Sequence, residues 1–175
     1  MREREEIIAA VIAAAGGELI GKVRLQKVVY LLDQLGLESG FRFEYHHYGP
    51  FSRDLVNAVE DAKAFHLLEE TSGQRNADLA RYSIFRLAHP LPTTDDSFGA
   101  MTQEKAEELA KNLVARDATV LELAATIHWL WKFEGRSNWR DELIRRKGPK
   151  IQNGRLERAI SLLEDLSLTP PQIAH

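Results

Sequence analysis

Residues that could perform chemistry are concentrated between Phe41 and Ser52, where five aromatic rings and two histidines surround a Gly-Pro pair. His46 and His47 are adjacent, so on a strand their side chains would point to opposite faces and could not share one metal ion. A metal site would need further ligands, such as His66 or Glu44. The sequence contains neither an HExxH motif nor a tight cluster of carboxylates and histidines. We therefore predict no metal site and no cofactor.

Motifs of nucleophilic and phosphate chemistry are also missing from the sequence. Gly-x-Ser-x-Gly does not occur, Ser52 is explained as a helix cap, and the Gly-Arg-Ser-Asn run at 135–138 reads as a helix stop followed by a cap. Neither GxGxxG nor GxxxxGK[ST] is present. His128 lies beside Trp129 and Trp131 in an apolar helical pattern, which favours a buried, hydrogen-bonded histidine over a catalytic base. We predict no catalytic residues and no enzymatic activity.

The aromatic segment has two interpretations. Its rings can anchor the turn, with Gly49 supplying an unusual φ and Pro50 a rigid start to the next turn. Alternatively, tyrosine and phenylalanine around a rigid turn form a partner-binding surface, because such rings are strong anchors at low entropic cost. The candidate contact residues are Tyr45, His46, His47, Tyr48, Gly49, Pro50 and Phe51, with Arg24 and Lys27 preceding them in the chain.

The composition of the 175 residues, 44% hydrophobic and 28% charged, is that of an ordinary globular protein. No apolar run approaches the roughly 20 residues that a bilayer requires, and no secretory signal is recognisable. The complete lack of cysteine excludes disulfides, thiolate catalysis and cysteine-rich zinc sites. We therefore expect a cytoplasmic protein with no membrane partner.

Charge is distributed unevenly, although the net charge is only −3. Residues 136–158 contain eight Lys or Arg against three acidic residues, a net charge of +5. This run is either a solvated helical face or a surface for an anionic partner. If nucleic acid binds, the candidate residues are Arg136, Arg140, Arg145, Arg146, Lys147 and Lys150.

The order of predicted elements in the first half is that of a winged helix. Apolar periodicity predicts helices at residues 3–15 and 22–35. Alternation predicts a strand from 41 to 46 that Gly49 and Pro50 interrupt, and Ser52 then caps a helix at 53–66. Extended runs at 67–71 and 82–87 around a polar tip predict a β-hairpin.

Beyond a connector at about residues 89–101, rich in Pro, Thr and Asp, the pattern is entirely helical. Helices are predicted at 102–115, 118–134, 137–146 and from 153 to about 166, with Thr102, Asp117 and Ser137 as caps. The helix at 118–134 is apolar on most faces, which is typical of the centre of a bundle. The fold class is α+β, mainly α. A winged-helix-like part with a small β-sheet (1–90) would pack on a helical subdomain (91–175), either as two parts or as one compact unit.

If the fold is winged, the helix at 53–66 is a poor reader of DNA. Its outward residues are expected to be Arg53, Asp54, Asn57, Glu60, Asp61 and Lys63. Three of them are acidic and would be repelled by phosphates.

Two motifs resemble known protein families. Residues 23–32, Val-Arg-Leu-Gln-Lys-Val-Val-Tyr-Leu-Leu, resemble a helix of the YwgA-like proteins of bacteria and archaea. A similar helix, and a similar Tyr-Gly-Pro before a capped helix (here 48–52), occur in the SocA/Panacea antitoxin domain. The stretches 121–127 and 147–150 look closer to the YwgA-like group. The resemblance spans about residues 23–166.

The resemblance implies no activity from the YwgA-like group. The antitoxin domain implies a proteolytic adaptor or a toxin-neutralising partner rather than an enzyme, and the chain departs from it at 121–127 and in its basic end. We predict a non-enzymatic, cytoplasmic interaction or regulatory protein, antitoxin-like or adaptor-like. Its partner would be a protein, such as a toxin or a target delivered to a protease, or a second copy of itself. The alternative is a DNA-binding transcriptional regulator with a winged helix-turn-helix. A third is a hydrolase or metal enzyme built on His46, His47 or His66.

Overall fold

Seven α-helices, one short 3₁₀ helix and five β-strands form the part of the chain that the computed structural model describes, residues 2–91 and 98–171. The fold is α+β and mainly α, as predicted. The first half comprises α1 (Arg4–Ala14), β1 (Glu18–Ile20), α2 (Lys22–Gln34), β2 (Glu44–His46), β3 (Gly49–Phe51), α3 (Arg53–Ala64), β4 (Leu68–Gln74) and β5 (Arg81–Leu87). The second half comprises α4 (Gln103–Val114), α5 (Ala118–Lys132), α6 (Trp139–Lys147), the 3₁₀ helix η1 (Gly148–Ile151) and α7 (Arg155–Asp165).

The helices of the first half follow their apolar periodicity. The stripe predicted on α2 is buried at Leu25, Val28, Val29 and Leu32, whereas its fifth member, Leu35, lies just beyond the helix and is partly buried. Helix α3 begins as predicted after Ser52, whose Oγ accepts a hydrogen bond from the Leu55 backbone N–H at 3.2 Å. These stripes face the core because burial of apolar surface is the main driving force for folding.

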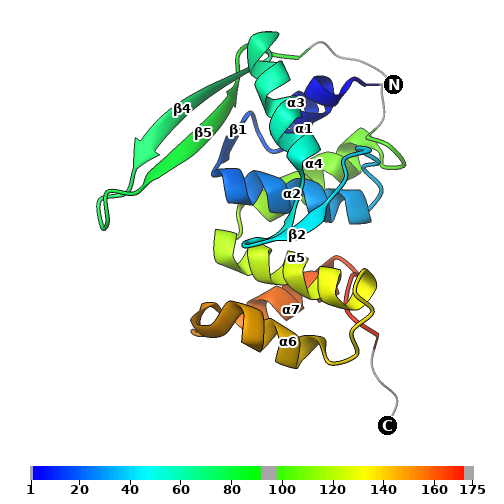
Figure 1. The fold of residues 1–175 in the computed structure, drawn as a ribbon. Helices are drawn as coiled ribbons and strands as arrows, with labels where there is room; N and C mark the ends of the chain where they lie inside the picture. Colours follow the sequence, from blue (N-terminus) through cyan, green and yellow to red (C-terminus); the bar gives the residue numbers. More distant parts are fainter. Residues whose placement is uncertain (1, 92–97, 172–175) are drawn as a thin grey trace.

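A three-stranded antiparallel sheet in the order β1-β5-β4 packs beside these helices. The predicted hairpin is confirmed as β4 and β5, paired from Leu68↔Leu87 to Gln74↔Arg81, and it projects from the body of the molecule (Figure 1). Strand β1 was not predicted, because only one of its three residues, Leu19, is buried. The assignment of these elements to the winged-helix class stays a prediction.

A second, two-stranded sheet carries the aromatic segment. Its strands β2 and β3 pair at Tyr45↔Pro50 and His46↔Gly49. The predicted strand at 41–46 is shorter in the structure, since β2 begins at Glu44, and Gly49 and Pro50, which were predicted to interrupt it, themselves lie in strand β3. The chain reverses at His47 and Tyr48, and Gly49 begins the returning strand. Pro50 is tolerated there because β3 has a partner strand on one side only, so a missing N–H need not interrupt a ladder.

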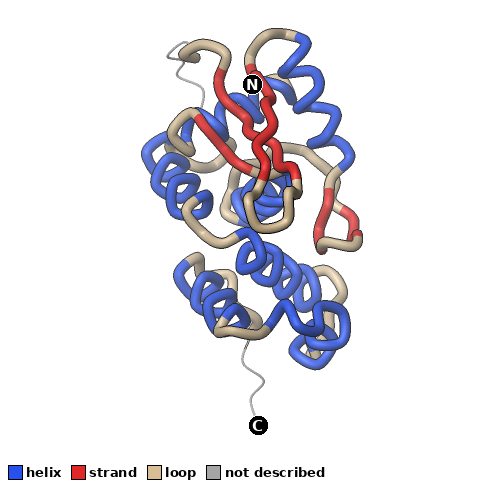
Figure 2. Tube along the Cα trace, turned by 90° about the vertical axis from the view of Figure 1, so that its left-hand side faces the viewer, coloured by secondary structure: helices blue, strands red, loops and turns tan. Residues whose placement is uncertain are grey.

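Helix α5 lies at the centre of the second half, as predicted. It packs on α2 and β3 from one side and on α6 and α7 from the other, and the region around α6 and α7 is wholly helical (Figures 1 and 2). Ten of its fifteen residues are buried. The core therefore runs continuously from α2 through α5 to α7.

The predicted boundary between the halves falls in the connector at 89–101, of which residues 92–97 lie outside the described residues. Helix α4, which the sequence assigns to the second half, packs on α1 and α2 of the first. The division at residue 90 stays a prediction.

Two helix starts in the second half differ from expectation. Helix α6 begins after Asn138 rather than Ser137, and within the described residues no side chain caps it. Helix α7 begins at Arg155 rather than Asn153, because residues 152–154 form turns after the 3₁₀ helix and Gly154 has a φ of 75°. Of the predicted loose tail, residues 172–175 lie outside the described part. Within the described residues, no helix has the length and apolar character needed to span a bilayer.

Candidate functional site

The two sequence motifs that resemble known families contact each other. Gln26 Nε2 donates a hydrogen bond to the Ser52 carbonyl at 3.0 Å, and Gln26 Oε1 accepts one from the Ser52 N–H at 2.9 Å. Lys27 Nζ donates to the Pro50 carbonyl at 2.6 Å. Helix α2 therefore holds the backbone of β3 from behind, and the turn at His47 and Tyr48 rests on a fixed support.

Lys27 is a buried support of this turn, since only 1% of the residue is exposed. Burial lowers its pKa to about 7, against a smaller opposing effect of Glu122 and a further lowering by Lys147 and Lys150. Burial thus disfavours the protonated form of the amine. Of the predicted contact residues, Lys27 acts from inside the molecule.

Gly49 permits α5 to approach the turn. Its φ is +91°, and a Cβ there would lie 2.6 Å from Thr126 Oγ1 and 3.7 Å from Lys27 Nζ. Thr126 is fully buried, and its hydroxyl has no hydrogen-bond partner among the described residues. The position therefore disfavours a side chain for two separate reasons, backbone conformation and space.

A group that we call the lysine cluster lies beneath the same turn and consists of Lys27, Glu122, Lys147 and Lys150. Buried Glu122 accepts hydrogen bonds from Lys147 Nζ and Lys150 Nζ, each at 3.0 Å. Lys147 Nζ also donates to the His47 carbonyl at 3.3 Å. Burial is the main cause that lowers the pKa of Lys147. The cluster joins α5 and α6 to the turn.

The outer side of the turn presents Tyr48, which is 50% exposed. The His47 ring meets it edge-on with centroids 4.9 Å apart, and Lys150 Nζ lies 4.8 Å from the Tyr48 ring centroid. A cation over the face of a tyrosine ring is attracted to it. Tyr48 is therefore an exposed ring whose position is restrained from two sides.

Phe51, at the other end of the turn, is partly buried. The His46 ring packs on it at 4.6 Å, and the Arg53 guanidinium lies 5.6 Å from its centroid. The four residues His46, His47, Tyr48 and Phe51 thus form one surface with cations at its edge, which we call the ring surface.

An apolar groove of about 160 Å³ opens beside the ring surface, between α2, α3 and β5. Tyr48 and Phe51 form its rim, and Leu55, Val56 and Phe85 are among its walls. Its charged lining residues are Lys22, Lys27, Glu60 and Glu70. Sequence reasoning missed the groove, because its lining comes from elements that are distant in the chain.

Two predicted contact residues lie apart from the ring surface. Tyr45 points to the opposite face of β2, where Arg146 lies 4.6 Å from its ring centroid and burial raises its pKa. Arg24 donates to the carbonyls of Ile20 at 2.5 Å and Arg116 at 3.2 Å, and so ties α2 to the segment after α4. Tyr45 and Arg24 therefore serve packing between elements.

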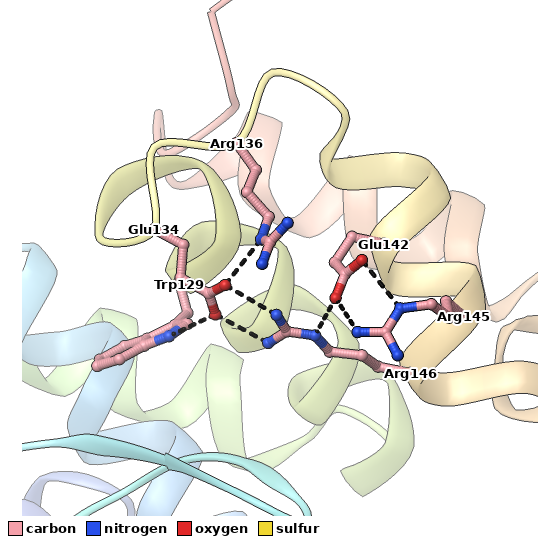
Figure 3. Close-up of polar contacts among 6 residues, drawn as sticks. All are labelled: Trp129, Glu134, Arg136, Glu142, Arg145 and Arg146. Carbon is pink, nitrogen blue, oxygen red and sulfur yellow. Dashed lines mark hydrogen bonds and ion pairs between the residues drawn. The ribbon is translucent and has the colours of Figure 1, made fainter.

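The basic run of the C-terminal half forms what we call the arginine network (Figure 3). Arg146 lies between two carboxylates: its terminal nitrogens donate to both Glu134 oxygens at 2.8 Å and its Nε donates to Glu142 at 2.6 Å. Arg145 binds Glu142, and Arg136 Nε donates to Glu134 at 2.8 Å. These hydrogen bonds, that of Arg146 first, lower the pKa of Glu134 to about 2.

The candidate nucleic-acid residues are largely engaged within the protein. Five of them, Arg136, Arg145, Arg146, Lys147 and Lys150, bind carboxylates of the chain itself, and Arg140 lies 5.1 Å from the Trp139 ring centroid. Much of the positive charge counted along the sequence is therefore neutralised in space by Glu122, Glu134 and Glu142.

His128 is buried and hydrogen-bonded, as predicted. Its Nδ1 lies 2.7 Å from the Tyr30 hydroxyl. Burial lowers the pKa of His128 to about 4 and raises that of Tyr30, so both groups are neutral at pH 7. The pair is a neutral link between α2 and α5.

The histidines weighed as metal ligands do not converge. His46 Nε2 lies 3.6 Å from Glu44 Oε2, His47 lies on the turn, and His66 lies beyond the end of α3. In residues 2–91 and 98–171, no group of three or more His, Asp or Glu side chains is arranged to hold a metal ion.

Comparison with known proteins finds a relative that covers most of the chain. No family model matches this chain. The chain is 22% identical over 153 residues to the uncharacterized protein YwgA of Bacillus subtilis (strain 168), a match that covers 86% of this chain and 89% of the relative. The resemblance to the SocA/Panacea antitoxin domain stays a prediction. The chain is thus similar to YwgA over most of both lengths, and that relative's name assigns no activity.

Proposed function

We propose that the protein is a non-enzymatic interaction protein that captures a segment of a protein partner on its ring surface and apolar groove. The observation that carries this proposal is the turn held from behind by Gln26 and Lys27, with half-exposed Tyr48 at the rim of the groove. An ordered, exposed ring next to an apolar cavity has the properties of a binding hot spot.

The fixed support of the turn favours binding energetically. Hydrogen bonds from Gln26 and Lys27 order the backbone before any partner arrives. The entropic cost of ordering these residues therefore arises when the protein folds and not when a partner binds. Contacts with Tyr48 then add to the affinity without that cost being subtracted.

The chemistry of the partner is inferred from the surroundings of the rings. The groove accepts an apolar side chain, while Lys150 and Arg53 border Tyr48 and Phe51. A partner segment with an apolar anchor and neighbouring acidic residues would complement both features. Such capture suits a cytoplasmic antitoxin-like, adaptor-like or regulatory protein, whose partner is a toxin or a target delivered to a protease.

The state of the titratable groups near the turn supports a non-enzymatic role. Lys27 and Glu122 are buried and bonded within the protein, and His128 is buried in a neutral pair with Tyr30. The lowered pKa values of Lys27 and His128 have structural causes, in burial first and then in neighbouring charges.

The test compares two exposed aromatic residues. Tagged wild-type protein and the Tyr48→Ala and Phe65→Ala variants are used to capture proteins from the host, with thermal unfolding measured in parallel. Phe65, 65% exposed beyond α3 and outside the groove, is the matched control. We expect Tyr48→Ala to lose the captured proteins with an unchanged melting temperature. Equal capture by both variants, or unfolding of Tyr48→Ala, would overturn the proposal.

A second pair addresses the groove. Val56→Asp places a carboxylate in its wall, whereas Asn57→Asp places the same group on the exposed side of the same helix. We expect only Val56→Asp to abolish capture, because burying an unpaired carboxylate against an apolar partner is unfavourable. If Asn57→Asp is equally damaging, charge on α3 and not the groove controls binding.

A DNA-binding regulator is the second candidate, favoured by the projecting β4–β5 hairpin with Arg75 and Arg81 near its tip. The intramolecular ion pairs of the basic run weaken this alternative. It predicts duplex binding that weakens steeply with salt. A gel-shift titration that stays flat at low salt would dismiss it.

A further inference from the structure

The acidic residues that line the apolar groove are neutralised within the chain. Glu70 lies 2.9 Å from Lys63 Nζ and 3.9 Å from Lys22 Nζ. Glu60 lies 3.1 Å from the same Lys63 nitrogen. Two carboxylates are thus paired with two amines, and this part of the groove favours neither a basic nor an acidic guest.

The remaining charged residue of the lining is Lys27, which is only 1% exposed. The hydrogen bond of its Nζ goes to a neutral group, the Pro50 carbonyl. Glu122, the carboxylate nearby, forms its ion pairs with Lys147 and Lys150. Among the residues that the structure describes, Lys27 itself forms no ion pair with a carboxylate. The lining therefore contains a buried amine without a counter-charge of its own.

The surroundings of Lys27 make an anion favourable beside it. Three amines of the lysine cluster share the single carboxylate of Glu122. Burial lowers the pKa of Lys27 to about 7, Glu122 opposes this effect, and the two neighbouring lysines lower the pKa further. A carboxylate next to Lys27 would supply the missing counter-charge and favour the protonated amine.

The rest of the groove suits a small apolar group. An apolar cavity of about 150 Å³ holds a benzene molecule. The groove, at about 160 Å³, therefore has room for one ring or a branched chain of similar size. Its apolar lining residues are Val23, Leu25, Phe51, Leu55, Val56, Val59 and Phe85. Apolar walls with one unpaired cation match a guest that has one apolar group and one negative charge.

We propose that the groove binds a small apolar carboxylic acid, with its ring or branched chain between α2, α3 and β5 and its carboxylate next to Lys27. The inference goes beyond the proposed function, because it names a free small molecule and requires no protein partner. A bound acid would fill the cavity beside Tyr48, so the acid and a partner segment would compete for the groove.

The first test compares three probes of similar size and different charge. Phenylacetate, phenylacetamide and phenethylamine are titrated into the wild-type protein by calorimetry at pH 7. We expect phenylacetate to bind about tenfold or more tightly than the neutral amide, because a hydrogen bond between charged groups is the stronger one. Phenethylamine should bind most weakly. Equal affinity for acid and amide, or no binding of the acid, would overturn the proposal.

The second test uses the proton that binding should take up. The pKa of Lys27, about 7 in the free protein, should rise when a carboxylate lies next to it. Affinity should therefore fall with rising pH above 7, by at most about tenfold per unit, until the pH exceeds the raised pKa. Calorimetry from pH 7 to 9 in Tris and HEPES, whose heats of ionisation differ, counts the protons. Constant affinity without proton uptake would refute the role of Lys27.

Two lysine variants locate the charge that the acid recognises. Lys27→Met removes the buried amine, whereas Lys22→Met removes an exposed lysine of the same groove and is the matched control. We expect Lys27→Met to bind acid and amide equally well and to lose the proton uptake. Lys22→Met should bind the acid within about twofold of wild type, since its ion pair is exposed. An equal loss in Lys22→Met would overturn the assignment to Lys27. If Lys27→Met unfolds, the proton count of the wild type decides.

Partner capture separates this inference from the proposed function. Saturating phenylacetate should reduce capture of host proteins by the wild type, and phenylacetamide at the same concentration should reduce it less. Capture that depends on Tyr48 in a protein that binds no acid would refute the inference and leave the proposed function standing. Acid binding by a protein that captures nothing would support the inference alone. Acid binding without any effect on capture would overturn the shared groove.

Discussion

In both the lysine cluster and the arginine network, side chains of the same basic run form ion pairs with glutamates, but the two groups differ in burial. In the lysine cluster, Glu122 and Lys147 have side chains only 4% and 3% exposed. Three amines gather there around one carboxylate, and the pKa values of Lys27 and Lys147 are lowered. Withdrawal from water therefore outweighs attraction to Glu122 for both lysines.

The arginine network is closer to solvent and behaves in the opposite way. Hydrogen bonds from Arg146 and Arg136 lower the pKa of Glu134 to about 2, and the pKa of Arg146 is raised. Here pairing favours the charged forms, because Arg146 binds both oxygens of Glu134 at once, and these hydrogen bonds outweigh the effect of its burial.

This difference shows that neighbouring ion pairs can have unequal roles. The lysine cluster supports the turn at His47 and Tyr48 from inside and should be sensitive to any missing partner. The arginine network joins α6 to the end of α5 and should tolerate loss of one charge, because water screens what remains. Four substitutions test this contrast.

The largest effect is expected for Glu122→Gln. The substitution leaves buried Lys147 beside a neutral amide, and breaking a buried pair typically costs about 3–5 kcal/mol. Urea denaturation at pH 7 should show a loss in the free energy of unfolding near that range. A loss below about 1 kcal/mol would mean that water already reaches the cluster.

Gly49→Ala should be the next most damaging. The left-handed backbone costs a side chain about 1–2 kcal/mol, and contact with Thr126 Oγ1 adds a further penalty of about 1–3 kcal/mol. Thr126→Ala alone should cost little, since it removes a hydroxyl without a partner among the described residues. In the double variant it should restore part of the stability lost by Gly49→Ala. Strictly additive losses would show that α5 does not restrict the turn.

The pH dependence of stability should depend on Lys27. Its folded pKa of about 7 lies below the ordinary 10.5, so between these values the unfolded chain binds more protons than the folded one. This lysine therefore makes stability rise with pH in that window, by at most about 1.4 kcal/mol per unit. Lys27→Met should flatten the rise, measured by urea denaturation from pH 7 to 9. An unchanged slope would assign the effect to other groups.

Glu134→Gln, the same change in the arginine network, should have the smallest effect on the free energy of unfolding. Because this pair is less buried than Glu122 and Lys147, the loss should be about 1–3 kcal/mol, below that of Glu122→Gln, and added salt should reduce it further. Because the pKa of Glu134 is lowered to about 2, its contribution is present above about pH 5 and is lost as pH falls towards 2. Thermal unfolding at pH 7 and pH 3 checks this. A loss equal to that of Glu122→Gln would remove the distinction between the clusters.

The sequence predicted those features that depend on neighbours within a few residues. The stripe of α2, the Ser52 cap and the central place of α5 follow from local periodicity and capping chemistry. Strand β1 was missed because three residues with one buried side chain carry too little pattern. The return of β3 through Pro50 was missed because proline normally signals the end of a strand.

The candidate site was predictable only in its location. The ring-rich segment was recognised from composition, but the sequence could not separate Tyr48, which faces solvent, from Tyr45, which packs against Arg146. The groove is lined by side chains of α2, α3 and β5, three elements that are distant from one another in the chain. No local sequence pattern therefore predicts it.

The sequence by itself determined the helices, the hairpin and the apolar faces, since these follow from the order of side chains along the backbone. Only the tertiary structure decided which charged side chains are buried and which counter-charges they contact. Glu122 meets Lys147 and Lys150 across 25 and 28 residues of chain, and Lys27 reaches Pro50 across 23. The physical reason is that a charge's free energy depends on its burial and its nearest counter-charge, and folding sets both.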